Sequence, residues 1–145
     1  MTVETETLSD YVEVKGRFRR SIHLEKDYVN ASQNGDYIVT PTALEALRRL
    51  TEGMGNGSPF RAWTLTGPYG VGKSAFAVFL TRLLCAAGKH GMQARTQLEQ
   101  ADPLLTKHLR ALGLFGRDSK GFLPVLATAR RTSASRCLAE GIVAS

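Results

Sequence analysis

The sequence predicts an α/β protein of one domain with parallel strands, on three observations. Short β-rich runs alternate with helical segments along the chain, which is typical of parallel sheets with right-handed crossovers. Residues 75–87 form a helical stretch that is apolar nearly all round, and such a helix suits a position against a sheet. The chain has 145 residues, of which 43% are apolar and 22% charged, and this is the length and composition of a single globular domain.

The N-terminal 36 residues are predicted to form an extended segment outside the main domain, which spans residues 37–145. Residues 1–14 contain four acidic residues and no basic one. Residues 11–24 follow with a strand-like alternation, and residues 33–36 (Gln-Asn-Gly-Asp) are typical of a turn.

The first helix of the main domain is predicted to begin after the short apolar run 37–39. Thr40 is a suitable N-cap, and Pro41 suits the first helical position because its missing N–H would have no helical partner there. Apolar residues at three- and four-residue spacing then give one stripe: Ala43, Leu44, Leu47, Leu50 and Met54. Glycines at positions 53, 55 and 57 are predicted to end this helix.

The remaining elements are predicted from similar patterns. Residues 62–66 (Ala-Trp-Thr-Leu-Thr) read as a central strand, and helix 75–87 ends at Gly88. A short helix is expected over 92–100, and Asp102-Pro103 should cap and start another that runs to about residue 112, with Gly113 beyond it. Residues 122–128 read as a second strand, where Pro124 indicates a sheet edge or a strand end, and residues 133–140 as a last helix.

The strongest chemical signal lies between the first strand and the helix 75–87. Gly67-Pro68-Tyr69-Gly70-Val71-Gly72-Lys73-Ser74 matches the pattern G-x-x-x-x-G-K-[ST] at every fixed position. Its glycines permit positive φ and a close approach of the backbone to a polyphosphate, and successive N–H groups form an anion nest at the start of a helix. Lys73 would contact the β- and γ-phosphates, and the Ser74 hydroxyl would bind Mg²⁺.

The predicted site therefore comprises residues that bind nucleotide and one that binds metal, with no catalytic residue assigned. The nucleotide-binding residues are Gly67, Pro68, Tyr69, Gly70, Val71, Gly72, Lys73, Ser74 and Ala75. Ser74 is the expected metal ligand, and ATP and Mg²⁺ are the expected cofactors. ATP is favoured over GTP because the chain lacks an Asn-Lys-x-Asp run.

In its strand-and-helix context this motif resembles the Walker A motif of the P-loop NTPases. Over residues 37–87 the chain resembles the N-terminal part of an AAA-type ATPase core, especially in the origin-recognition and STAND branches. The resemblance implies an αβα sandwich with parallel strands and ATP hydrolysis that drives conformational change. It also makes Tyr37, Ile38 and Val39 candidate adenine contacts, for which plain core packing is the alternative role.

The chain departs from these ATPases by lacking a Walker B element, an apolar strand that ends in Asp or Asp-Glu. The acidic residues after the motif are Glu99, Asp102, Asp118 and Glu140, and none ends an apolar run. The chain is also shorter than an AAA core, so it is interpreted as an incomplete, N-terminal part of such a module. Nucleotide binding is therefore favoured over hydrolysis by this chain alone.

Two other functions stay open at this point. One is a small P-loop kinase, although acidic residues placed for an acceptor are missing. The other is a noncatalytic module whose basic surface binds nucleic acid or a protein partner, since the chain has 19 Lys and Arg against 13 Asp and Glu, a net charge of +6. Arg17, Arg19 and Arg20 form a small basic patch, or a solvated edge. Arg130 and Arg131 are either surface residues or an arginine finger toward a neighbouring subunit of a homo-oligomer.

Composition also bears on location. The longest apolar run, 75–80, is far too short for a membrane span, and the N-terminus lacks the basic and apolar segments of a secretory signal. Cys85 and Cys137 form neither a disulfide framework nor a zinc site, and the three histidines lack metal-ligand spacing. These features predict a cytoplasmic protein with no membrane partner.

Overall fold

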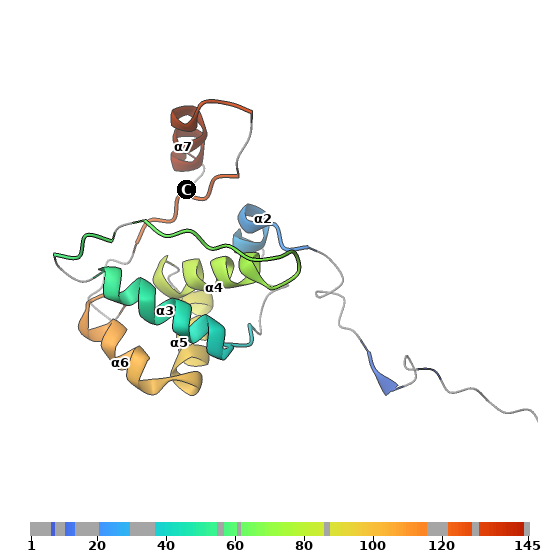
Figure 1. Cartoon of the computed structure of the whole chain (residues 1–145), viewed down its shortest axis with the longest axis vertical. Coiled ribbons are helices and arrows are strands. Elements are labelled where there is room, and N and C mark those ends of the chain that lie inside the picture. The colour runs from blue at the N-terminus through green and yellow to red at the C-terminus, as the bar shows by residue number, and fades with distance from the viewer. Residues whose placement is uncertain are drawn as a thin grey trace, which may run out of the picture.

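The computed structural model describes residues 7, 11–13, 21–29, 37–54, 57–60, 62–85, 88–115, 122–128 and 131–143. Within these ranges every regular element is a helix (Figure 1). The helices are α2 (Leu24–Val29), α3 (Pro41–Met54), α4 (Lys73–Cys85), α5 (Gly88–Ala101), α6 (Pro103–Ala111) and α7 (Ala134–Val143). The prediction of an α/β sandwich with parallel strands is therefore wrong for the described part of the chain.

The two predicted strands, 62–66 and 122–128, have no regular secondary structure and belong to no sheet among the described residues. Both lie against helices instead. The ring of Trp63 lies against Gly53 of α3, and the Phe122 N–H donates to the Leu84 carbonyl oxygen of α4 at 3.4 Å. The β-rich composition identified segments suited to a half-buried pleated surface, but a strand forms only where a second segment completes the hydrogen-bond ladder.

Helix α3 confirms the prediction made for residues 41–54. The Thr40 hydroxyl accepts a hydrogen bond from the Ala43 N–H at 3.2 Å, which caps the helix as expected. The buried face contains Ala43, Leu47, Thr51 and Gly53. Gly53 lies inside the helix rather than beyond its end, and the neighbouring Trp63 ring leaves no room there for a side chain.

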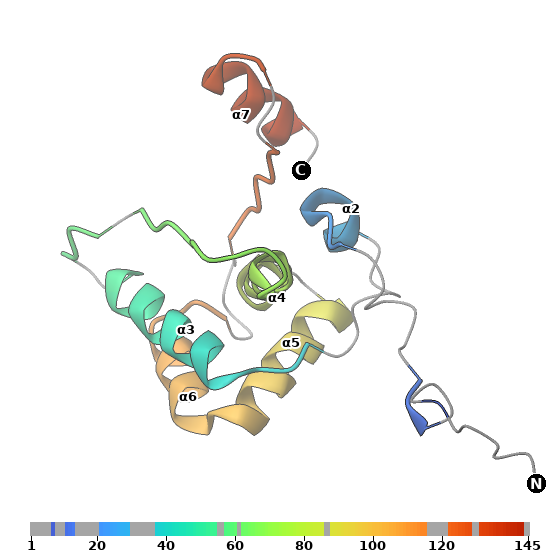
Figure 2. The ribbon, with the colours of Figure 1, turned by 45° about the vertical axis from the view of Figure 1, so that its right-hand side comes forward.

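Helix α4 occupies the centre of the packed helices, where the prediction had placed it against a sheet. Helices α2 and α5 both contact α4, and α5 in turn contacts α6. Figure 2 looks nearly along α4 and shows α3, α5 and α6 on one side of it, with α2 on the other. The buried apolar residues of this core are Ala43, Leu47, Phe76, Phe79, Leu83, Leu84, Ala94, Leu98, Leu105, Leu109, Leu114 and Phe115. The neighbouring helices thus bury the apolar side chains of α4, which the prediction had placed against a sheet.

The helices after α4 confirm the sequence prediction in type, and several of their boundaries differ from the predicted ones. Helix α5 begins at Gly88, with φ +68°, and so starts earlier than the predicted 92–100. Helix α6 follows Asp102 as predicted, with Gly113 beyond its end at φ +70°. Helix α7 begins at Ala134, one residue after the predicted start at 133, and continues past the predicted end at 140 to Val143.

Helix α7 stands apart from the other helices in both views (Figures 1 and 2). Gly141 is its buried residue, and a Cβ at this position would lie 3.1 Å from the Val125 Cγ1 atom and 3.2 Å from the Leu126 carbonyl oxygen. The extended segment 122–128 is thus the described neighbour that α7 packs against.

The predicted extended segment 11–24 is described only in part. Residues 14–20 lie outside the described residues, as do 30–36, where the turn cluster was predicted. Residues 12–13 and 21–23 have no regular structure, and Leu24 opens α2 instead of ending an extended run. In the described part of the chain, no helix combines the length and the apolar character that crossing a bilayer requires.

Candidate phosphate-binding loop

Residues 67–72 form an exposed loop that leads directly into α4 (Figure 1). Its three glycines have positive φ: +151° at Gly67, +85° at Gly70 and +86° at Gly72. Residues with a Cβ rarely adopt this conformation, so the glycines of the motif stand where the backbone needs them. The Phe76 N–H donates to the Gly72 carbonyl oxygen at 2.9 Å, which places the first turn of α4 immediately after the loop. The positive end of the helix dipole therefore faces this loop.

The Lys73 side chain turns back over the loop. Its ammonium group donates to the carbonyl oxygens of Gly67 at 2.8 Å and of Pro68 at 2.6 Å. A positive charge is thereby held beside the glycine-rich backbone, at the surface. An ammonium group has three N–H donors and can exchange such neutral acceptors for phosphate oxygens, with which its hydrogen bonds are stronger.

Ser74 and Ala75 occupy the first turn of α4, next to Lys73. Ser74 is exposed and Ala75 half-buried. A Cβ built at Gly70 or Gly72 would meet nothing within 4 Å, so this side of the loop opens to solvent. No group of three or more His, Cys, Asp or Glu side chains that could hold a metal ion exists among the residues the structure describes.

The acidic residues considered for a Walker B role have other partners. Glu99 pairs with Arg110 at 3.0 Å, and Glu140 pairs with Arg136 at 3.0 Å. Asp102 caps α6 and pairs with Arg48 at 2.6 Å. Asp118 lies outside the described residues. The three described acids that follow the motif in sequence therefore each have an arginine partner.

The candidate adenine contacts 37–39 divide between core and surface. Tyr37 stacks on Phe79 of α4, with ring centroids 4.5 Å apart and an interplanar angle of 21°. Tyr37 and Val39 both pack against the core, and burial raises the pKa of the Tyr37 phenol, whereas Ile38 is 74% exposed. For Tyr37 and Val39 the structure thus supports the alternative role of core packing.

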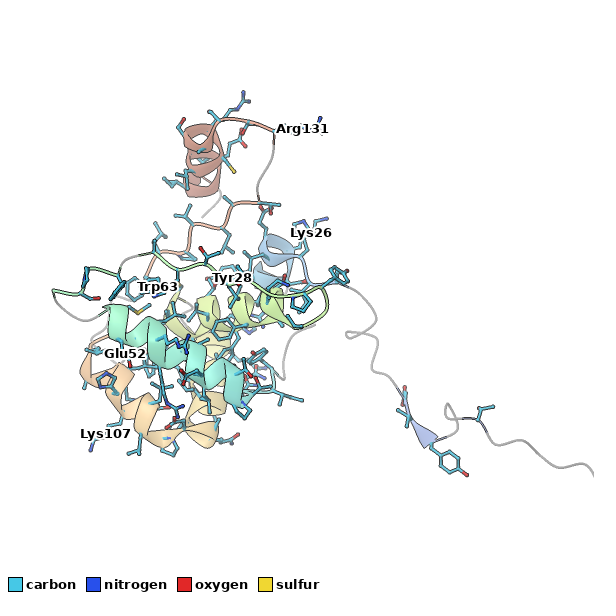
Figure 3. All side chains as sticks on the ribbon, in the orientation of Figure 1. Lys26, Tyr28, Glu52, Trp63, Lys107 and Arg131 are labelled. Carbon is cyan, nitrogen blue, oxygen red and sulfur yellow. The ribbon has the colours of Figure 1, made fainter. Side chains whose placement is uncertain are left out.

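The remaining predicted residues lie away from the loop or outside the described part. Arg17, Arg19, Arg20 and Arg130 are not described. Arg131 is exposed, at the turn that leads to α7 (Figure 3). Cys85 and Cys137 are both free thiols and partly exposed, and burial raises the pKa of the Cys85 thiol.

Sequence reasoning missed the contacts that residues 21–29 make with the loop and with α4. The Ser21 and Tyr69 hydroxyl oxygens are 2.6 Å apart, and Arg82 of α4 donates to the Asp27 carbonyl oxygen at 2.6 Å. The Asp27 carboxylate also accepts the His23 N–H at 2.7 Å. This bond spans four residues and not the three of a capping box, so the sequence contains no recognised signal for α2 or for its position beside α4.

Comparisons of the chain with protein-family models, with curated proteins and with solved structures found no match.

Proposed function

We propose that this chain binds the triphosphate group of ATP, together with Mg²⁺, at residues 67–75. The observation that carries the proposal is the backbone of the loop, in which three glycines with positive φ precede a 13-residue helix that starts at Lys73. Glycines in this conformation direct successive N–H groups toward one side of the backbone, and the helix adds its own unpaired N–H groups at the same place. In proteins that bind nucleotides with the motif G-x-x-x-x-G-K-[ST], N–H groups at this place hold the phosphates.

Each residue type in the loop has a role in the proposal. Lys73 leaves the carbonyl oxygens of Gly67 and Pro68 and donates to the terminal phosphates, where its charge offsets theirs. The Ser74 hydroxyl binds Mg²⁺, which screens the remaining phosphate charge. Gly70 and Gly72 let the backbone approach the phosphates, since their Cα atoms face open space.

The proposal is for nucleotide binding and does not extend to hydrolysis. Hydrolysis needs a carboxylate that orients the attacking water and holds the metal. Glu99, Asp102 and Glu140, the described acids that follow the loop in sequence, each bind an arginine.

Calorimetric titration of the full chain with Mg-ATP tests the proposal. We expect Lys73→Ala to weaken binding about tenfold or more, because a hydrogen bond to a charged group contributes about 1.5–3 kcal/mol and 1.4 kcal/mol corresponds to a factor of ten. Lys107→Ala is the matched control, since Lys107 is exposed on α6, away from the loop (Figure 3). Ser74→Ala should reduce the difference between titrations with and without Mg²⁺.

Two results would contradict the proposal. One is negligible binding heat for the wild-type chain. The other is an equal affinity of wild type and Lys73→Ala, which would place any nucleotide elsewhere on the molecule.

A further inference from the structure

The segment 21–29, here called the strap, contacts three parts of the molecule that are distant in sequence. At its start, the Ser21 hydroxyl oxygen lies 2.6 Å from that of Tyr69, in the candidate loop. In its middle, the Glu25 carboxylate accepts hydrogen bonds from the Thr128 N–H at 2.9 Å and the Thr128 hydroxyl at 2.7 Å. Further along, the Asp27 carbonyl oxygen accepts from Arg82 of α4 at 2.6 Å.

The strap is anchored on α4 rather than resting loosely on the surface. Asp27 is 1% exposed and Arg82 is 6% exposed, and charged groups are rarely buried to this degree unless they are paired. Burial lowers the pKa of the Arg82 guanidinium, while the Asp27 carboxylate raises it. Hydrogen bonds between His23 and Asp27 in both directions, at 2.7 and 2.8 Å, fix the first turn of α2. Figures 1 and 2 both show α2 beside α4.

Tyr69 connects this anchored strap to the loop. Its side chain is 90% exposed, so packing contributes little to its position and the hydrogen bond with Ser21 is its main described contact. Tyr69 directly follows Pro68, whose carbonyl oxygen accepts from Lys73. The position of the Lys73 ammonium and that of the Tyr69 side chain are therefore linked through one peptide unit.

The contacts of Lys73 and Tyr69 stabilise the observed conformation of the loop. A polyphosphate that draws the Lys73 ammonium away from the Gly67 and Pro68 carbonyl oxygens releases the peptide that carries Tyr69. The Tyr69 side chain then moves with this peptide, and its hydrogen bond with Ser21 is broken. Because coupling between two sites is reciprocal, a bond that nucleotide binding breaks also opposes nucleotide binding.

We propose that the strap is an autoinhibitory element of the nucleotide site, with the Tyr69–Ser21 hydrogen bond as its contact and the Glu25–Thr128 bonds as its link to segment 122–128. This inference rests on the proposed function. Nucleotide binding loosens the strap at its Ser21 end while Asp27 stays anchored on α4, and loss of the Tyr69–Ser21 hydrogen bond tightens nucleotide binding.

Variants that remove one hydroxyl each test the inference on the full chain. We expect Tyr69→Phe and Ser21→Ala to tighten Mg-ATP binding by a similar factor of about two to ten, the range for the net contribution of one hydrogen bond. The double variant should be no tighter than either single variant, because both remove the same bond. Tyr11→Phe and Ser135→Ala, in exposed residues outside strap and loop, are the matched controls.

Hydrogen exchange of the backbone amides tests the inference a second time, without a measurement of affinity. Backbone amides of 21–29 should exchange faster in Tyr69→Phe than in wild type without nucleotide, and faster in wild type after Mg-ATP is added. Unchanged exchange and unchanged affinity in both single variants would overturn the inference, as would additive effects in the double variant. If wild type binds no Mg-ATP at all, the proposed function fails and the inference with it. If wild type binds Mg-ATP and neither variant changes the affinity or the exchange rates, the autoinhibitory role of the strap is wrong and the proposed function stands.

Discussion

Gly53 and Trp63 meet where α3 ends and the segment that enters the candidate loop begins. A Cβ at Gly53 would lie 2.3 Å from the Trp63 Cζ2 atom and 2.9 Å from the Phe60 carbonyl oxygen. The absence of a side chain at Gly53 therefore lets the Trp63 ring lie on α3, as Figure 3 shows. This contact fixes the approach of the chain to Gly67, four residues later.

We predict that Gly53→Ala destabilises the protein by about 1–2 kcal/mol. The clash belongs to the overpacking class, which costs about 1–3 kcal/mol, and the better helix propensity of Ala returns about 0.5–1 kcal/mol of that. Urea unfolding followed by circular dichroism measures the change. In the double variant Gly53→Ala with Trp63→Leu, the loss should be smaller than the sum of the two single losses. A Gly53→Ala variant as stable as wild type would show that the ring moves aside freely.

At the scale of single residues, the features that depend on local chemistry could be predicted from the sequence. The Thr40 and Asp102 caps and the turn-forming glycines of the loop were predicted from residue type alone, since each depends on a few neighbouring backbone atoms. The Ser21–Tyr69 bond was not predicted. It joins residues 48 positions apart, and no local pattern records such a contact.

At the scale of elements, Asp102 links two helices. Its carboxylate accepts the Leu105 N–H at 2.9 Å, which caps α6, and it pairs with Arg48 of α3 at 2.6 Å. The Leu105 N–H lowers the pKa of Asp102 and Arg48 lowers it further, and these outweigh the partial burial, which raises it. The folded-state pKa is thus below the unfolded-state value.

From this direction we predict the pH dependence that Asp102 contributes. A carboxyl group with a depressed folded-state pKa stabilises the fold fully above its unfolded-state pKa, about 3.9, and loses that contribution as the pH falls through its folded-state pKa. Asp102→Ala should lower the free energy of unfolding by about 1 kcal/mol at neutral pH, the usual effect of losing a cap, and by less near pH 3. Asp102→Asn keeps the cap but not the charge, so its loss should be smaller. Urea unfolding at several pH values measures both, and a loss that stays constant down to pH 3 would contradict the ionised cap.

The elements themselves were predicted unevenly. Helices α3, α4, α5, α6 and α7 were expected near their observed positions, because helical periodicity and caps lie within one stretch of chain. The prediction of strands at 62–66 and 122–128 is wrong, because neither segment has regular secondary structure. A strand requires a partner from elsewhere in the chain, and β-propensity does not specify whether that partner exists.

At the scale of the whole molecule, burial separates a core from its periphery. Leu47, Leu83, Leu98 and Leu109 are at most 2% exposed and belong to the cluster that joins α3, α4, α5 and α6. Helix α7 lies outside this cluster, and its Leu138 is 55% exposed. The α/β prediction failed at this scale because an apolar helix can be covered by a sheet or by other helices, and both covers satisfy the same composition.

The last prediction follows from this separation. Leu83→Ala should destabilise the protein by about 2–5 kcal/mol, because it opens a cavity in a core that cannot fully collapse. Leu138→Ala makes the same chemical change on α7 and should cost about 0.5 kcal/mol or less, as expected for a largely exposed side chain.

Hydrogen exchange of the wild type measures the same separation. Amides of α4 and α5 should be protected by most of the free energy of unfolding, whereas amides of α7 should exchange through local opening, at least about tenfold faster. Equal protection of α4 and α7 would mean that α7 unfolds together with the core, and segment 122–128 would then have to be a structural part of that core rather than a connection to a peripheral helix.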